Sequence, residues 1–347
     1  MQAERTCLSE ILPTHTAALF NTAVKRAAAL LRAGEIVALP TETVYGLAAN
    51  ALDPKAVEAI FTAKGRPAEN PIIVHVASLD MARECVTQWP VEARRLAHAF
   101  WPGPLTLVLP RSPRIPDIVT AGGPTVGIRW PSHPFIQAVI RECGFPLAAP
   151  SANPANQLSP TTVEHVRQAL GDKVRLIVDG GQSHVGIEST VLDLTVRPPA
   201  VLRPGMVHAE SIRAVLPECR MQSAECRVTE TAGTHLKSPG QLPRHYSPRA
   251  ELKVLRWRDE EDLRSQISNL KFEPPKVHIV AHTLIPSAAG WGRVSVIPHD
   301  AEAFARAIYA ELHACDQHGA GLIVVEEPPD TDEWRAIRDR LNRAAAR

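Results

Sequence analysis

The sequence predicts an α/β protein in which a mixed, twisted open sheet precedes a smaller α/β domain. Short apolar runs that are typical of strands alternate with amphipathic helical stretches, which is the pattern of the α/β class. The strands of the first part follow one another too closely for a purely doubly wound design, so we expect a mixed sheet. A proline-punctuated stretch without apolar periodicity, at about residues 221–249, separates the two parts.

The first part opens with an amphipathic helix over Ala17–Arg32, and Gly34 is a typical signal for its end. A second helix is predicted at Pro54–Ala63, because Asp53 can cap it and Pro54 suits the first helical position. Apolar runs bounded by turn residues predict strands at Ile36–Pro40, Pro71–Val76, Leu105–Leu109, Val126–Trp130, Leu147–Pro150, Leu176–Asp179, Thr190–Leu194 and Ala200–Arg203. Further helices are predicted at Val91–Phe100, Pro134–Arg141, Thr162–Leu170 and Ala209–Leu216.

The second part is expected to be a small α/β unit of roughly Rossmann-like design. Its predicted elements are strands at Leu252–Trp257, Val277–Ala281, Val294–Ile297 and Leu322–Glu326, and helices at Glu260–Leu270, Ala301–His318 and Trp334–Ala345. It contains no G-x-G-x-x-G pattern, so the sequence does not support dinucleotide binding there. The predicted division is a first domain at 1–222, a linker or lid at 223–249 and a C-terminal domain at 250–347.

Composition is that of an ordinary globular protein, with 45% hydrophobic and 22% charged residues among 347. The six cysteines form no C-x-x-C pair, so we expect neither a zinc site nor a disulfide framework, and no metal-ligating residues are predicted. We expect no signal peptide, no run of about 18 apolar residues that could span a bilayer, and a cytoplasmic location. A net charge of +1 argues against a globally basic nucleic-acid binder but leaves a local basic patch open.

Two cations in the segment Lys64-Gly-Arg-Pro67 are the most informative feature. Lysine supplies a compact charge and arginine a planar fork, so Lys64 and Arg66 together suit an anion with several oxygens. If the chain is extended there, both side chains point to one side. For this pair alone, a solvated basic turn is the ordinary interpretation, and we expect the turn to be exposed.

Further polar groups follow apolar runs, at strand ends where open α/β sheets hold ligands. Arg129 and Arg203 each end a predicted strand, and an arginine in that position usually forms a structural ion pair. Four cations in a neutral chain favour a shared anionic ligand instead. Hydroxyl groups add neutral donors, although each taken singly is more often a cap or a turn residue; they are Thr41, Thr43, Thr125, Ser151, Ser159, Ser189 and Thr190.

The ordered motifs resemble those of the Sua5/YrdC family of L-threonylcarbamoyladenylate synthases. They are Pro40-Thr-Glu-Thr-Val-Tyr-Gly-Leu47, Lys64-Gly-Arg-Pro67 with Asn70 and His75, Trp101-Pro-Gly-Pro-Leu-Thr106, Val126-Gly-Ile-Arg129, Pro150-Ser-Ala-Asn153, Gly186-Ile-Glu-Ser-Thr-Val191 and Leu202-Arg-Pro-Gly205. The linker and the second part resemble the two-domain Sua5 branch. The resemblance implies a YrdC-like twisted open sheet with a concave basic cleft, and a catalytic role for the first domain.

The resemblance also implies the roles of single residues. Lys64 and Arg66 fall at the family's catalytic Lys-x-Arg signature, and Ser151 with Asn153 at its Ser-x-Asn signature. L-threonine is expected at Thr43, His75, Arg129, Ala149 and Ser189, with Arg129 facing its carboxylate. ATP is expected at Arg66, Asn70, Thr125, Ser151, Asn153, Ser159 and Arg203, and Tyr246 is expected to fold over the nucleotide from the linker.

The implied reaction condenses L-threonine, bicarbonate and ATP to threonylcarbamoyl-AMP and pyrophosphate, for N6-threonylcarbamoyladenosine at position 37 of tRNAs that read ANN codons. Its reactants are anionic, so we expect fixed cations and Mg²⁺ accompanying ATP, with no organic cofactor. The partners that it suggests are ATP, L-threonine, bicarbonate, tRNA and the downstream threonylcarbamoyl-transfer complex, with no membrane. Two alternatives stay open: a carbamoyltransferase-type YrdC relative, and a non-catalytic module that binds double-stranded RNA or tRNA.

Overall fold

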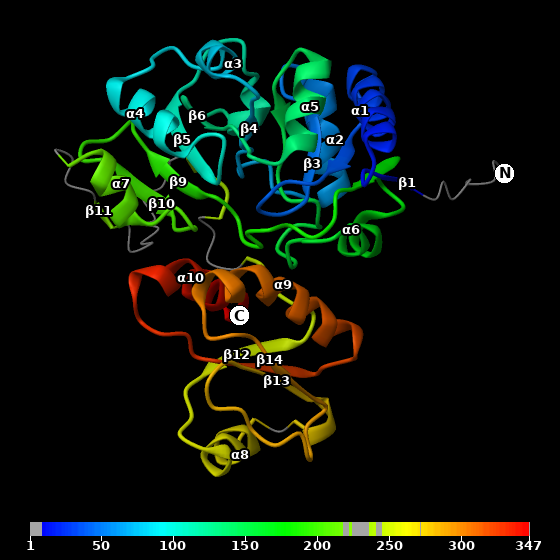
Figure 1. Cartoon of the computed structure of the whole chain (residues 1–347), viewed down its shortest axis with the longest axis vertical. Coiled ribbons are helices and arrows are strands. Elements are labelled where there is room, and N and C mark those ends of the chain that lie inside the picture. Colours follow the sequence, from blue (N-terminus) through cyan, green and yellow to red (C-terminus); the bar gives the residue numbers. More distant parts are fainter. Residues whose placement is uncertain (1–8, 218–221, 224–235, 241–244, 271, 347) are drawn as a thin grey trace. The chain divides into compact units, whose positions relative to one another are not determined.

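The computed structural model describes residues 9–217, 222–223, 236–240, 245–270 and 272–346 (Figure 1). The chain divides into two compact units. The first comprises Met1–Ala155, Pro160–His184 and Glu188–Leu242, and the second comprises Asn156–Ser159, Val185–Ile187 and Pro243–Arg347. The contiguous boundaries that the sequence suggested stay a prediction, and residues 224–235 and 241–244 of the predicted linker lie outside the described part.

An eleven-stranded sheet forms the first unit, in the order β1-β8-β2-β3-β7-β4-β6-β5-β9-β10-β11. Parallel pairs such as β4·β6 and β5·β9 alternate with antiparallel pairs such as β4·β7 and β5·β6, so the predicted mixed sheet is confirmed. The strands are β1 (Glu10–Pro13), β2 (Val37–Leu39), β3 (Gly46–Asn50), β4 (Val74–His75), β5 (Leu105–Pro110), β6 (Thr125–Arg129), β7 (Leu147–Ala148), β8 (Leu176–Asp179), β9 (Thr190–Asp193), β10 (Ala200–Arg203) and β11 (Gln222–Ser223).

The helices of this unit begin at the caps that the sequence provides. Thr16 accepts the backbone N–H of Leu19 at the start of α1, and Asp53 accepts that of Lys55 at the start of α2. Gly65 ends α2 in the left-handed region, with φ of 59°. The helices are α1 (Ala17–Arg32), α2 (Pro54–Lys64), α3 (Leu79–Glu84), α4 (Val91–Phe100), α5 (Pro134–Cys143), α6 (Val163–Leu170) and α7 (Ala209–Val215).

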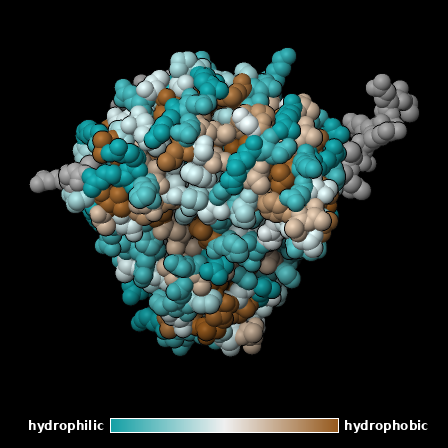
Figure 2. Space-filling model, turned by 45° about the horizontal axis from the view of Figure 1, so that its top comes forward, coloured by the Kyte–Doolittle hydropathy of each residue, from teal (hydrophilic) through white to brown (hydrophobic). Residues whose placement is uncertain are grey.

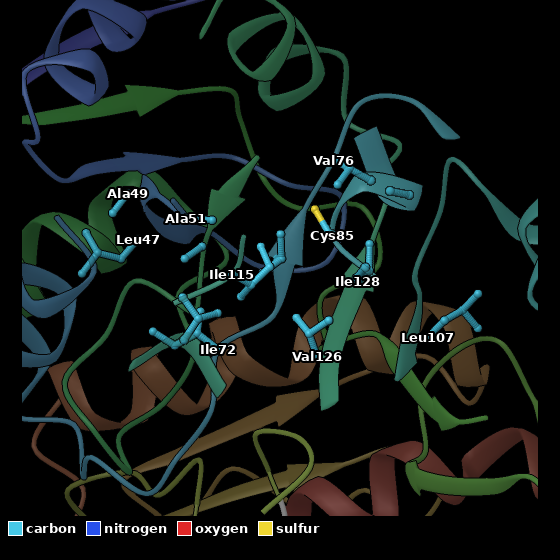
Figure 3. Packing of buried hydrophobic residues seen from close by; sticks show 14 of the residues in the cluster. Leu47, Ala49, Ala51, Ile72, Val76, Cys85, Leu107, Ile115, Val126 and Ile128 are labelled. Atoms are coloured by element: carbon cyan, nitrogen blue, oxygen red, sulfur yellow. The ribbon is translucent and has the colours of Figure 1, made fainter. Parts of the chain in front are cut away.

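Both faces of the sheet are buried. Alternate residues of a strand point to opposite faces, so neighbouring residues of β2 and β3 belong to two different core clusters. Ala38 and Leu47 belong to a large core cluster that includes residues of α2, part of which Figure 3 shows. Val37, Leu39 and Ala48 belong to a second cluster with α1 and α5, which lie side by side (Figure 1). The sheet is therefore held between helices, and its strand ends are fixed from both sides.

The sequence did not predict strands β1, β3 and β11 or helix α3. Strand β3 has the sequence GLAAN, without the β-branched or aromatic residues that favour strands, and pairing with β2 and β7 overrides that weak propensity. Strand β4 is shorter than predicted, at two residues. Pro71 cannot donate to a strand ladder, and its carbonyl accepts from Arg66.

The second unit carries a parallel sheet in the order β12-β15-β13-β14. Its elements are β12 (Glu251–Leu255), α8 (Glu260–Ser268), β13 (Val277–Ala281), β14 (Arg293–Val296), α9 (Ala301–Gln317), β15 (Leu322–Glu326) and α10 (Arg335–Ala345). These match the predicted elements, and the α/β class is confirmed for both units. The Rossmann-like label and the concave basic cleft stay predictions.

Hydrophilic side chains surround small apolar groups on the face that Figure 2 shows. Large apolar side chains that are exposed among the described residues include Ile11, Val91, Leu284, Ile285 and Val296. Within the described ranges, no helix is both long enough and apolar enough to cross a membrane.

Candidate active site

Sheet register brings polar residues of neighbouring strands to one level, among them the predicted threonine-binding residues His75 and Arg129. His75 of β4 pairs with Arg129 of β6, and Thr106 of β5 pairs with Val191 of β9. Next to β9, the Ser189 hydroxyl lies 2.8 Å from that of Thr106. The strands β4, β6, β5 and β9 are consecutive in the sheet, so an imidazole, a guanidinium and two hydroxyls form a row across it.

Arg129 is buried at the end of β6, and three contacts hold its guanidinium. Its Nε donates to the carbonyl of Gly103 at 3.3 Å, and its Nη1 donates to the Thr43 hydroxyl at 2.9 Å. Its Nη2 lies 2.7 Å from Oε1 of Glu42, and both side chains are about 5% exposed. The structural ion pair is therefore real, and Glu42 is a site residue that the sequence interpretation missed. Its only signal was its position inside the Thr-Glu-Thr motif.

The ion pair sets the charge states around it. Burial alone would raise the pKa of Glu42, but the charge and hydrogen bond of Arg129, together with backbone N–H groups, lower it below its usual value. The pKa of His75 falls to about 3, because the ring is buried and lies near the Arg129 cation. His75 is thus a neutral imidazole near pH 7, and Glu42 is ionised.

The Thr41–Tyr45 loop is fixed by its own side chains and by the turn after β8. The Thr41 hydroxyl accepts the backbone N–H of Val44 at 3.2 Å and lies 2.9 Å from the Thr43 hydroxyl. The Tyr45 hydroxyl donates to the carbonyl of Gly181 at 2.7 Å and accepts the N–H of Gly180 at 3.2 Å. A Cβ on Gly180 would lie 2.6 Å from the Pro40 ring, so this close approach requires glycine.

Lys64 joins two distant signature motifs. Its Nζ donates to the carbonyl of Ser151 at 2.6 Å, to the carbonyl of Asn153, and to Oδ1 of Asn153 at 3.3 Å. Burial, and to a lesser extent the Arg66 charge, lower the pKa of Lys64 well below its usual value. The oxygens around Nζ are nevertheless acceptors, so the ammonium form is the one that satisfies them.

The expected exposure of this turn is wrong at Lys64, and the condition of an extended chain is not met. Lys64 is only 4% exposed, so the turn is not a solvated one at this residue. The chain is not extended there either, because Lys64 is the last residue of α2 and Gly65 is left-handed. Arg66 instead bonds to residues that follow it in the chain, where its Nε donates to the carbonyl of Asn70 and its Nη2 to Oδ1 of Asn70 at 2.8 Å.

Arg203 closes the other end of the row. Its Nε donates to the carbonyl of Ser189 at 3.0 Å, and its Nη2 donates to the Ser189 hydroxyl at 3.2 Å. Gly205 follows in the same motif, and a Cβ there would lie 2.4 Å from the backbone nitrogen of Thr190. The Leu-Arg-Pro-Gly motif thus positions Ser189 through Arg203 and permits the backbones to meet at Gly205.

The other residues that the resemblance assigned to substrate binding lie in different parts of the two units. Ala149 is buried beyond β7, and its N–H donates to Ile73. Thr125 begins β6, roughly 13 Å from Arg129 along a five-residue strand. Ser159 and Tyr246 belong to the second unit, where the Ser159 carbonyl lies 3.1 Å from Nε2 of His313 and the Tyr246 ring packs near Tyr309. Their nucleotide contacts stay predictions.

The described residues include no group of three or more His, Cys, Asp or Glu side chains that could hold a metal ion. Glu42, the carboxylate in the row, is already paired with Arg129. A dedicated protein cage for Mg²⁺ therefore does not fit the described part of this site. A Mg²⁺ ion that is held mainly by nucleotide phosphates and water needs no such cage.

Comparison with known proteins covers nearly the whole chain. A family model described as "Telomere recombination" matches residues 29–205, and one described as "Threonylcarbamoyl-AMP synthase, C-terminal domain" matches residues 207–346. A threonylcarbamoyl-AMP synthase of Pyrococcus abyssi is 40% identical over 326 residues, which cover 93% of this chain and 94% of that protein. One of Bacillus subtilis is 39% identical over 325 residues, covering 93% and 92%. The crystal structure of P. abyssi Sua5 complexed with L-threonine matches with a TM-score of 0.88 at 38% identity, covering 97% of this chain and 98% of that chain.

Proposed function

We propose, from the premise that this chain belongs to the Sua5/YrdC family, that it is an L-threonylcarbamoyladenylate synthase. It condenses L-threonine, bicarbonate and ATP to threonylcarbamoyl-AMP and pyrophosphate, and so acts as a nucleotidyltransferase. The product supplies the threonylcarbamoyl group of N6-threonylcarbamoyladenosine at position 37 of tRNAs. The tRNA and the protein complex that transfers the group are the partners that this role requires.

The observation that carries the proposal is the meeting of two signatures at one ammonium group. Lys64 ends a helix and Ser151 and Asn153 follow a strand, yet both contribute oxygens to the Lys64 Nζ. The Lys-x-Arg and Ser-x-Asn motifs are thus one structural unit in this chain. Relatives that carry the synthase name match over more than 90% of both chains, which extends the likeness to the complete arrangement.

In the proposed reaction, the threonine nitrogen and bicarbonate first form a carbamate with loss of water. A carbamate oxygen then attacks the α-phosphorus of ATP, and the bond to the bridging oxygen breaks to release pyrophosphate. Arg129 faces the threonine carboxylate with its planar fork, while the neutral His75 and the hydroxyls of Thr43 and Ser189 supply uncharged polar contacts. Positioning and charge neutralisation suffice, because the protein needs no nucleophile of its own.

The nucleotide belongs near the Lys64 end of the site in this proposal. Lys64 keeps a positive charge there and bonds to Ser151 and Asn153, while Arg66, two residues further along the chain, bonds to Asn70. A Mg²⁺ ion bound with ATP would be held mainly by the phosphates and water, and it would offset part of their charge. Thr125, Ser159, Arg203 and Tyr246 complete the proposed set of nucleotide contacts.

Pyrophosphate release is the decisive measurement. Turnover of ATP to pyrophosphate should require both L-threonine and bicarbonate, and omission of either should reduce the rate to background. Equal release without threonine would contradict the proposal. Affinity for double-stranded RNA without any ATP turnover would favour the non-catalytic alternative, and transfer of a carbamoyl group without threonine would favour the carbamoyltransferase.

A further inference from the structure

Glu42 is a buried carboxylate that the proposed reaction does not use. It lies between Thr41 and Thr43 in the loop after β2, and it is 5% exposed. Its Oε1 is 2.7 Å from Nη2 of Arg129, while Thr43 accepts from Nη1 of the same guanidinium. Two consecutive residues of one loop therefore contact both terminal nitrogens of Arg129.

These contacts orient the Arg129 guanidinium without using all of its N–H groups. A guanidinium has five N–H groups, and the described contacts to Gly103, Thr43 and Glu42 engage its three nitrogens once each. Nε and Nη1 each donate one hydrogen bond and Nη2 faces Glu42 in an ion pair, so the terminal nitrogens retain N–H groups that a ligand carboxylate can accept. A guanidinium free to rotate about its side-chain bonds would present these N–H groups in many directions.

Glu42 supplies an opposite charge to the buried Arg129 guanidinium. A carboxylate at this distance offsets part of the desolvation penalty of the cation and fixes the direction in which one terminal nitrogen points. Hydrogen bonds hold the loop in place. Ser183 donates to the carbonyl of Thr41 at 3.0 Å, and the Tyr45 hydroxyl is hydrogen-bonded to the Gly180–Gly181 turn. The carboxylate is thus presented to Arg129 by a rigid support.

We propose that Glu42 is a positioning residue that aims the Arg129 guanidinium at the carboxylate of L-threonine. The inference rests on the proposed function, since it takes threonine as the ligand of Arg129. It makes Glu42 specific for the amino-acid half of the reaction, with no part in nucleotide binding. Glu42 acts through Arg129 and need not touch the substrate.

A double-mutant cycle of Glu42→Gln and Arg129→Lys tests this action through Arg129. L-Threonine binding is measured by calorimetry, which does not depend on catalysis, and the KM for ATP is measured by pyrophosphate release. Glu42→Gln should weaken threonine binding about tenfold or more in the native background, and less than twofold when Arg129 is already lysine. The KM for ATP should change less than twofold.

Equal losses of threonine affinity in both backgrounds would overturn the proposal, because Glu42 would then contact the substrate independently, for instance at its ammonium group. Unchanged threonine binding would also overturn it and leave only a structural ion pair. A parallel rise in the KM for ATP would indicate collapse of the whole site and would overturn it as well.

Controls separate these results from misfolding and from failure of the proposed function. Glu35→Gln removes the 3.0 Å surface pair with Arg175 in the same unit and should leave threonine binding unchanged. If thermal unfolding shows that Glu42→Gln is not folded, Glu42→Asp replaces it. This variant draws the carboxylate back by one methylene group, and the same pattern of results is expected. If the native protein binds L-threonine but releases no pyrophosphate, the proposed synthase activity is refuted, whereas the double-mutant cycle on L-threonine binding can still be measured. A native protein that does not bind L-threonine would refute both.

Discussion

Two buried cations of the first unit, Lys64 and Arg129, are stabilised in opposite ways. Around Lys64 the partners are peptide and amide oxygens, which carry no net charge. Arg129 instead has the carboxylate of Glu42 at 2.7 Å. The Lys64 end of the candidate site thus keeps a positive charge, whereas the charges of Arg129 and Glu42 cancel at the other end. A polyanion such as ATP suits the first end, and a zwitterion such as an amino acid suits the second.

The comparison predicts that Arg129→Ala has the largest effect on folding. It leaves Glu42 buried and ionised without its partner, which should lower the free energy of unfolding by about 3–5 kcal/mol. Urea unfolding measures the loss, and adding Glu42→Gln to the variant should restore much of it. If the single variant is as stable as the native protein, Glu42 is not held by Arg129. In folded enzyme, the threonine requirement should also rise, by about 2–3 kcal/mol in apparent binding free energy.

Lys64→Ala should come next, with a loss in both stability and turnover. Removal of the ammonium leaves buried oxygens of Ser151 and Asn153 without their donor, at a cost of about 1–3 kcal/mol. Turnover should fall more than tenfold, because a fixed charge near a developing anion is lost. Lys55→Ala, an exposed lysine on the same helix, is the matched control and should change neither quantity. Full activity of Lys64→Ala would show that the lysine has a structural role only.

A pH experiment probes the neutral end of the site through His75. The folded protein holds the pKa of His75 at about 3, against an ordinary value of 6.5, so the unfolded chain binds the proton first as pH falls. The stability from the neutral ring is complete above pH 6.5 and declines below it, by up to about 1.4 kcal/mol per pH unit. Between pH 7 and pH 5 the native protein should therefore lose about 2 kcal/mol more than His75→Asn.

Urea unfolding at both pH values measures this difference. His98→Asn, which changes an exposed histidine of α4, should keep the native dependence on pH. Equal slopes for the native protein and His75→Asn would mean that the ring binds its proton as readily in the folded protein as in the unfolded chain, which would contradict the lowered pKa.

Sequence patterns predicted most helices, because caps such as Asp53 and closing glycines such as Gly65 act locally. They also singled out Lys64, Arg129 and Ser189, because polar residues that directly follow or end an apolar run are visible in the sequence itself. Strand β3 and the Glu42–Arg129 pair were missed for a common reason. Both depend on partners that are distant in sequence, since β3 is held by β2 and β7, and Glu42 gains its role only when β6 brings Arg129 to it. The burial of Lys64 was missed likewise, because its acceptors lie 87 or more residues away.

The division of the chain into units has a consequence for the order of events during synthesis. Asn156–Ser159 and Val185–Ile187 lie between segments of the first unit in the sequence but belong to the second unit. The Asn156 carbonyl accepts the N–H of Ser247 at 2.9 Å, and Gly186 approaches α9 so closely that a Cβ would lie 2.4 Å from the carbonyl of Ala305. A ribosome delivers these partners more than 80 residues after the segments themselves. Both contacts can therefore form only after the later part of the chain has emerged, and translation that stops at residue 217 yields a polypeptide in which neither contact can form.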